Sequence, residues 1–137
     1  MAYETKWLLP GRVIYMANRG AITVEELQDE SLRLIELLEE GEGPLVHLLT
    51  DVTELGEFPI SVGVLNRASI DALRHPKMGW LLVITDNRML KYLGSMVTGL
   101  SGVRYRAFTS VDEALAFLNE VDSTLPDLLA WDQDVEI

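Results

Sequence analysis

Two short apolar runs, Leu45–Leu49 and Trp80–Ile84, restrict the possible folds more than any other feature of the sequence. Runs of this length that do not alternate with polar residues are typical of strands buried on both faces. Segments with the apolar spacing of amphipathic helices lie before, between and after the two runs. Strands that alternate with helices of this length predict an α/β domain with a mostly parallel sheet and right-handed crossovers.

The other segments add an N-terminal antiparallel hairpin, so that we expect a five-stranded sheet with about four helices. Pro10 and Gly11 suit the central positions of a tight turn between strands at 3–9 and 12–17. A helix is expected over 23–40, where Thr23 and Glu26 have the spacing of a capping box. Further helices are expected over 62–73, 88–98 and 110–121, and an edge strand over 103–108.

A chain of 137 residues is most simply one domain, which we place at 1–122, followed by a docking tail at 123–137. Because sequential crossovers share one hand, the successive helices are expected on one face of the sheet. The opposite face then needs a cover, since such strands are apolar on both sides. The tail, with Leu128, Leu129 and Trp131, or a second copy of the protein would supply it, and a homodimer is favoured over a monomer.

The net charge of −11 is unevenly placed. Acidic residues dominate 25–42 and 112–136, whereas lysine and arginine dominate 58–111. Charged helix faces in solvent are the simpler interpretation, and a basic face that meets an acidic or phosphorylated partner is the sharper one. So acidic a chain argues against a nucleic-acid partner, because it would repel the phosphate backbone.

The sequence also bears on the compartment. It contains no cysteine, which excludes disulfide scaffolds and suits a reducing cytoplasm. The first residues lack the apolar core of a signal peptide, and no apolar run approaches the length of a membrane span. We therefore expect a cytoplasmic protein without a membrane span.

Function is expected in the segment Asp51–Arg67, between the first apolar run and the next helix. A central strand ends there, a polar loop with Gly56 and Pro59 follows, and Ser61 stands where a helix N-cap would. We expect a protein partner to bind at Asp51, Thr53, Glu57, Phe58, Ser61 and Asn66. No nucleophile elbow, phosphate-binding loop or dinucleotide fingerprint occurs in the sequence, so we expect neither catalysis nor a cofactor.

The histidines and the acidic loop do not favour a metal site. Only two histidines are present, and His47 in its apolar strand is interpreted as a core histidine with satisfied hydrogen bonds. Asp51, Glu54 and Glu57 lack the spacing of a calcium loop and are interpreted as a solvated acidic loop.

An alternative interpretation places a small ligand pocket near the ends of the second and third helices. The lining would come from Phe58, Met78, Trp80, Met89, Met96 and Leu100. Methionine and aromatic side chains equally serve to fill irregular gaps in a core, so both interpretations stay open.

The order of elements from Lys6 to Val121 resembles the STAS domain in its SpoIIAA-like form. Three pieces carry the likeness: the strand that leads into a capped helix at 12–23, the strand end at 48–51 with its loop to Ser61, and the strand-to-helix close at 105–118. The resemblance implies a SpoIIAA-like (STAS) fold. It also implies a bacterial, non-catalytic interaction module similar to anti-sigma factor antagonists. The Sec14-like branch of this fold binds lipids, which implies a carrier of a small apolar or lipid ligand as the alternative.

The resemblance further implies a phosphorylation site. In anti-sigma factor antagonists, a partner kinase phosphorylates a serine at the start of the second helix. Asp51 and Thr53 match the aspartate and serine that open the family's motif, and Ser61 falls on the modified serine by spacing, although positions 59, 60 and 62 depart from the motif. Ser61 is thus the candidate phosphoacceptor, and a kinase or regulator the implied partner. A helix cap without modification is the other interpretation of Ser61.

Overall fold

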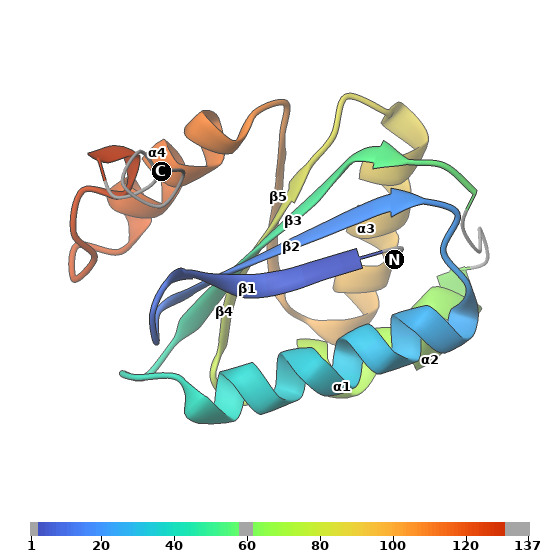
Figure 1. Ribbon diagram of the computed structural model, residues 1–137, viewed down its shortest axis with the longest axis horizontal. Helices are drawn as coiled ribbons and strands as arrows, with labels where there is room; N and C mark the ends of the chain where they lie inside the picture. The colour runs from blue at the N-terminus through green and yellow to red at the C-terminus, as the bar shows by residue number, and fades with distance from the viewer. Residues whose placement is uncertain (1–2, 58–61, 131–137) are drawn as a thin grey trace.

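The structure is a computed structural model, which describes residues 3–57 and 62–130. Among these residues it has five strands and four helices (Figure 1). In chain order they are β1 (Tyr3–Leu9), β2 (Val13–Gly20), α1 (Val24–Glu40), β3 (Val46–Leu55), α2 (Val62–Leu73), β4 (Met78–Ile84), α3 (Arg88–Ser101), β5 (Arg104–Phe108) and α4 (Val111–Val121). Residues 128–130 form a further helical turn.

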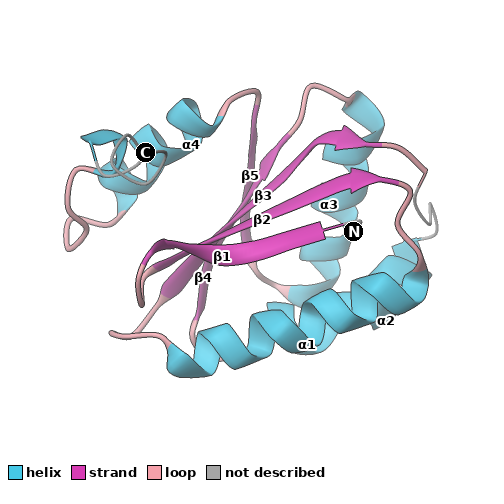
Figure 2. Ribbon diagram, in the orientation of Figure 1, coloured by secondary structure: helices cyan, strands magenta, loops and turns pink. Residues whose placement is uncertain are grey.

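The strands form one sheet in the order β1-β2-β3-β4-β5, as Figure 2 shows. β1 and β2 are antiparallel, and every other neighbouring pair is parallel. The hairpin turn is closed by a bond from the Arg12 N–H to the Leu9 carbonyl, with Gly11 at a φ of 79°. Proline and then glycine at the two central positions supply that geometry. The predicted α/β class, mostly parallel sheet and N-terminal hairpin are confirmed.

Local sequence signals explain where most helices begin and end. The capping box at α1 is present: the Thr23 hydroxyl accepts from the Glu26 N–H, and the Glu26 carboxylate accepts from the Thr23 N–H. α3 runs three residues past its expected end at 98, to Ser101. Gly99 does not break it, and the helix ends instead at Gly102, whose φ of 80° is left-handed.

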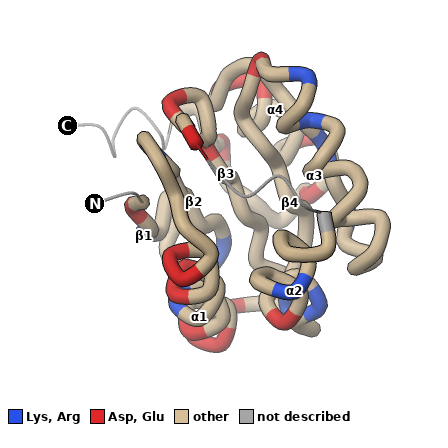
Figure 3. The backbone as a smooth tube through the Cα atoms, turned by 90° about the vertical axis from the view of Figure 1, so that its right-hand side faces the viewer, with Lys and Arg blue, Asp and Glu red and all other residues tan. Residues whose placement is uncertain are grey.

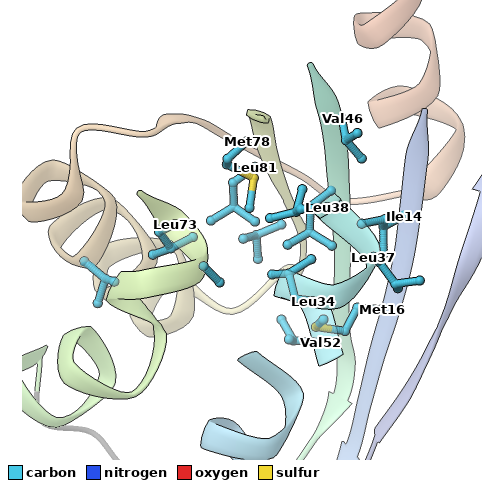
Figure 4. Packing of buried hydrophobic residues seen from close by; sticks show 14 residues of the cluster. Ile14, Met16, Leu34, Leu37, Leu38, Val46, Val52, Leu73, Met78 and Leu81 are labelled. Atoms are coloured by element: carbon cyan, nitrogen blue, oxygen red, sulfur yellow. The ribbon is translucent and has the colours of Figure 1, made fainter. Parts of the chain in front are cut away.

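The sheet separates two apolar cores. α1, α2 and α3 cover one face, where Leu34, Leu37 and Leu38 of α1 point toward Ile14 and Met16 of β2 (Figure 4). The second core lies on the opposite face, where α4 is placed (Figure 1). Neighbouring residues of one strand divide between the cores, as a strand buried on both faces requires.

The expectation that all helices share one face is wrong for α4. The handedness rule constrains a helix that connects two parallel strands, and no strand follows α4 in the described chain. α4 is therefore free to fold over the bare face. Leu125 and Leu128 of the tail are buried beside it in the same core. One chain thus covers both faces, which removes the main reason for expecting a homodimer, although the dimer itself stays a prediction.

Candidate functional site

Asp51 lies at the end of the sheet where the parallel strands terminate, and its side chain makes hydrogen bonds within the chain. Its carboxylate accepts hydrogen bonds from the Tyr15 hydroxyl at 3.0 Å and from the Thr53 N–H at 3.0 Å and hydroxyl at 2.7 Å. Burial and the bond to Asp51 raise the pKa of Tyr15 well above its usual value, so Tyr15 remains a donor. The carboxylate is thereby engaged within the chain.

The other predicted partner-binding residues are only partly gathered at this edge. Thr53 and Glu57 are exposed at and beyond the end of β3. Asn66 lies on α2, with its carbonyl oxygen buried and without a hydrogen-bond partner. Phe58 and Ser61 lie outside the described residues.

The structure does not bring the predicted pocket residues together. Met78 is buried in the core under α1–α3, whereas Trp80 packs edge-on against Phe117 of α4 on the opposite face. Met89, Met96 and Leu100 are exposed on α3, and Phe58 is not described. None of the five described residues lines the apolar cavity that the protein does contain.

A β-bulge explains why Met78 and Trp80 separate. Val46 pairs with Met78, but Leu48 pairs with Leu81, so β4 contains one additional residue between these two pairs. An extra residue moves the following side chains to the other face of the sheet. Residues two apart, which normally share a face, therefore face opposite cores here.

The cavity has a volume of about 200 Å³ and lies between the sheet and the inner faces of α1, α2 and α3. Its lining is mostly apolar and includes Met16, Leu34, Val52, Leu65, Ala72 and Val97. Three of these residues, Met16, Leu34 and Val52, lie close together in Figure 4. Native cores are close-packed with few voids larger than a water molecule, so a mostly apolar space of this size calls for an explanation.

Asn18 and Glu30 are two of the polar residues that line this cavity. Asn18 on β2 and Glu30 on α1 are only 5% and 6% exposed. The Asn18 Oδ1 and Glu30 Oε2 atoms are buried without a hydrogen-bond partner. Burial raises the pKa of Glu30 to about 7, although a hydrogen bond with the Asn18 side chain opposes the shift. Unpaired buried oxygens are rare in native proteins and call for a reason.

Sequence analysis missed Glu30 because it was grouped with the acidic residues of a solvated helix face. The signal was nevertheless present in the helical period. Glu30 follows Leu27 by three residues and precedes Leu34 by four, so it falls on the apolar stripe. An acid on that stripe is a stronger indication of a site than an acid on the wet face.

A second polar cluster links the end of α4 to the sheet. The His47 Nε2 lies 2.9 Å from Asp122 Oδ2, and its Nδ1 accepts from the Trp80 N–H at 3.0 Å. The Arg12 guanidinium donates to Asp122 at 3.3 Å and to the Thr124 hydroxyl at 2.7 Å. Both imidazole nitrogens are thus engaged, and the Trp80 bond assigns the proton to Nε2.

The electrostatics of this cluster fit a structural role. Burial lowers the pKa of His47 and outweighs the bond to Asp122, which acts in the opposite direction. Burial would raise the pKa of Asp122, but hydrogen bonds from Thr124 and His47 outweigh it and lower that pKa to about 2. A neutral histidine with no free nitrogen cannot act as a general base. The interpretation of His47 as a satisfied core histidine is confirmed.

The outer face of α3 is apolar and exposed. Met89, Tyr92, Met96 and Leu100 follow one another at helical spacing and are 42–62% exposed. Ser95 and Gly99, also exposed, add no charge to this face, and α3 contains no acidic residue. Figure 3 shows acidic residues concentrated along α1 and basic residues on α2. The α3 face is therefore an uncharged strip on an otherwise charged molecule.

Comparisons with known proteins support the fold. No family model matches the sequence, and no curated protein matches it. A solved structure, an uncharacterized protein of the DUF3478 family with a SpoIIAA-like fold from Shewanella loihica PV-4, is similar with a TM-score of 0.63. The match covers 85% of this chain and 92% of that chain at 14% sequence identity. A likeness at this identity shows a SpoIIAA-like fold, as the resemblance implied.

Two further observations concern the described residues alone. No helix within 3–57 and 62–130 is long and apolar enough to cross a membrane. The same residues bring together no group of three or more histidine, aspartate or glutamate side chains suited to a metal ion.

Proposed function

We propose that this SpoIIAA-like domain is a non-catalytic protein-interaction module whose partner binds the outer face of α3 and the adjoining end of the sheet. The observation that carries the proposal is the row of Met89, Tyr92, Met96 and Leu100, which exposes large apolar side chains with no charge among them. Contiguous exposed apolar patches mark protein-interaction sites, whereas scattered single apolar residues on a surface are ordinary.

This face adjoins the segment expected to bind a partner. Asp51 of β3 pairs with Ile84 of β4 in parallel, so the carboxyl ends of both strands lie at the same end of the sheet. α3 begins at Arg88, shortly after β4 ends. The first turn of α3 and residues 51–57 thus belong to one end of the molecule. Arg88 and Lys91 on α3 favour a partner with an apolar centre and an acidic rim.

A paired substitution on the face tests this proposal. Tyr92→Lys with Met96→Lys places two charges on exposed positions, which should leave folding intact while opposing an apolar contact. Leu32→Lys is the matched control, because Leu32 is a 63% exposed leucine on α1. Proteins captured from the native cell extract by the wild type and by Leu32→Lys, and lost with the paired variant, would be the partners. Identical captured sets from all three proteins would exclude the α3 face.

The loop between β3 and α2 is tested separately by alanine at Glu57, Phe58 and Ser61. Phosphorylation at Ser61 remains part of this proposal, on the strength of the family resemblance. If Ser61 is a switch, Ser61→Asp should abolish partner binding and Ser61→Ala should not, since added charge changes the partner surface. Equal binding by the two variants, measured by calorimetry with the captured partner, would leave Ser61 as a helix cap.

The cavity favours a second candidate function, the carriage of a small apolar ligand. A void lined by apolar side chains, with unpaired oxygen atoms on its wall, is the usual form of a small-molecule site. Native mass spectrometry of the purified protein tests this function. A co-purifying small molecule would support it, and a clean mass together with no thermal shift from any apolar compound would exclude it.

A further inference from the structure

The shape of the cavity follows from small residues on the helices around it. Ala68, Ser69 and Ala72 of α2 face the cavity, where larger apolar residues would close it. Gly94 of α3 also lines it, but a Cβ at that position would lie 2.8 Å from the Tyr105 hydroxyl, so the absence of a side chain there makes room for Tyr105. The space therefore depends mainly on the small residues of α2.

The polar end of the cavity offers hydrogen-bond acceptors. Asn18 Oδ1 and Glu30 Oε2 are both unpaired, and both belong to side chains more than nine-tenths buried. An unpaired buried acceptor loses the bonds that it made to water, and a ligand that donates restores them. Two acceptors on one wall require a donor group at the facing end of the ligand.

The charge of the residues that line the cavity further restricts the class of ligand that can bind. No lysine, arginine or histidine lines the cavity among the described residues, and Glu30 is its one ionisable side chain there. A carboxylate or phosphate would enter without a counter-charge and opposite an acid, which is strongly unfavourable. Anionic lipids and the ionised form of fatty acids are therefore not expected to bind.

Volume sets the size of the apolar part. A dry protein cavity of roughly 150 Å³ holds one benzene molecule. A space of about 200 Å³ therefore suits a slightly larger molecule, of about six to eight carbon atoms by the same scale. A long acyl chain exceeds this space.

We propose that the cavity between α1–α3 and the sheet binds a compact apolar molecule that carries one hydrogen-bond donor, a hydroxyl or an ammonium group, held by Asn18 and Glu30. This inference rests on the second proposed function, that the protein binds a small apolar ligand. It adds the polarity, charge and size of that ligand.

Four probes of equal chain length test the inference: hexane, 1-hexanol, hexylamine and hexanoate. Their binding is followed through the methyl resonances of Ala68 and Ala72, which lie in the cavity wall. We expect 1-hexanol or hexylamine to bind at least tenfold more tightly than hexane, and hexanoate to bind most weakly. Preference for 1-hexanol identifies the natural group as a hydroxyl, and preference for hexylamine identifies it as an ammonium.

Variants at the polar end show whether the preference comes from these two residues. Glu30→Met and Asn18→Leu each remove an acceptor while keeping approximate volume. Both should reduce the preference for the donor-bearing probe to less than threefold and leave hexane binding in place. Glu36→Gln on the same helix is the control, because its side chain is 64% exposed, and it should keep the full preference. Should one variant fail to fold, the other still measures the effect.

The outcomes separate the inference from the function on which it rests. If hexane binds as tightly as both 1-hexanol and hexylamine, or hexanoate binds best, the inference fails while the ligand-binding function stands. If no probe moves the Ala68 and Ala72 resonances, both fail. A donor preference that survives Glu30→Met and Asn18→Leu would also overturn the assignment to these residues.

Discussion

His47 illustrates how one buried side chain constrains the residue types and backbone geometry around it. Its Nδ1 accepts a hydrogen bond from the Trp80 N–H at the bulge of β4, and its Nε2 is hydrogen-bonded to Asp122 at the end of α4. The imidazole occupies the space next to Gly79, where an added Cβ would lie 2.4 Å from Nδ1. The histidine was expected in the core, but the glycine and the bulge that accommodate it depend on contacts between strands that no local pattern reveals.

Gly79→Ala is therefore expected to destabilise the protein by about 1–3 kcal/mol, because the methyl group forces the imidazole or the bulge to move. Gly99→Ala is the matched control: it lies within α3, and a Cβ there meets nothing within 4 Å. Alanine at that exposed helical position should stabilise the protein by up to about 1 kcal/mol. Urea unfolding of the two variants measures both effects, and equal loss in both would contradict the steric argument.

Glu30 makes stability depend on pH in a direction opposite to most carboxylates. Its pKa is about 7 in the folded protein, because of burial, against 4.5 for an ordinary glutamate. Between these values the folded protein binds more protons than the unfolded chain, so stability falls as pH rises. His47 and Asp122 have lowered pKa values and act in the opposite sense, since their contributions are lost as pH falls.

Comparison with Glu30→Gln isolates the contribution of Glu30. Glutamine cannot ionise, so the variant should match the wild type near pH 4 and exceed its free energy of unfolding by about 3 kcal/mol above pH 8, at about 1.4 kcal/mol per pKa unit. Urea unfolding from pH 4 to 9 measures the difference, with Glu36→Gln as the exposed control. A constant difference across this range would show that Glu30 ionises at its ordinary pKa.

Among the elements, those with strong local signals were predicted well. The capping box at Thr23 and Glu26 places α1 within one residue of its observed start. β3 was predicted only over its apolar part, but it continues through polar residues to Leu55 because Gly20 of β2 pairs with Leu55. Strand pairing, rather than local composition, fixes that end. The face covered by α4 and the face taken by Trp80 were likewise inaccessible to periodicity, since each depends on topology or a bulge.

The cavity shows the same limit for the candidate site. Its lining comes from residues on strands and helices far apart in sequence, and its polar end joins β2 to α1. The methionines and Trp80 that suggested a pocket are instead placed on an exposed helix face or in two separate cores. Residue type alone does not distinguish a pocket wall from a core or a surface strip.

Filling the cavity from α2 should stabilise the protein. Ala68→Leu adds apolar volume to existing space, with an expected gain of about 0.5–2 kcal/mol and loss of 1-hexanol binding. Ala114→Leu is the control, because Ala114 is fully buried in the second core and does not line the cavity. Leucine there overpacks the core and should cost about 1–3 kcal/mol. Thermal unfolding of both variants measures these effects. A loss of stability in Ala68→Leu would show that the cavity cannot accommodate a larger side chain from α2.

For the whole molecule, the unusual feature is that the second face of the sheet is closed by α4 and the chain that follows it. Leu128 is fully buried and Leu125 is 8% exposed, both among residues from β1, β2, β3, β4 and α4. The Asn119 side chain fixes this segment by donating to the Pro126 carbonyl and accepting from the Leu128 N–H. Leu125 and Leu128 of the tail thus belong to the core, whereas Leu129 is 38% exposed and Trp131 lies outside the described residues.

Truncation after Asp122 removes that cover and keeps the bond between Asp122 and His47. Burying two leucines contributes about 3–6 kcal/mol before the entropy of ordering the segment is subtracted. We therefore expect a lower melting temperature, new binding of an apolar dye, and self-association as the bared face seeks another cover. Truncation after Ala130 is the control, since it leaves Leu125 and Leu128 in place, and it should melt at a higher temperature than the chain that ends at Asp122. Calorimetry and sedimentation of the three proteins test this. Unchanged melting temperature and mass in the chain that ends at Asp122 would mean that α4 alone closes the sheet.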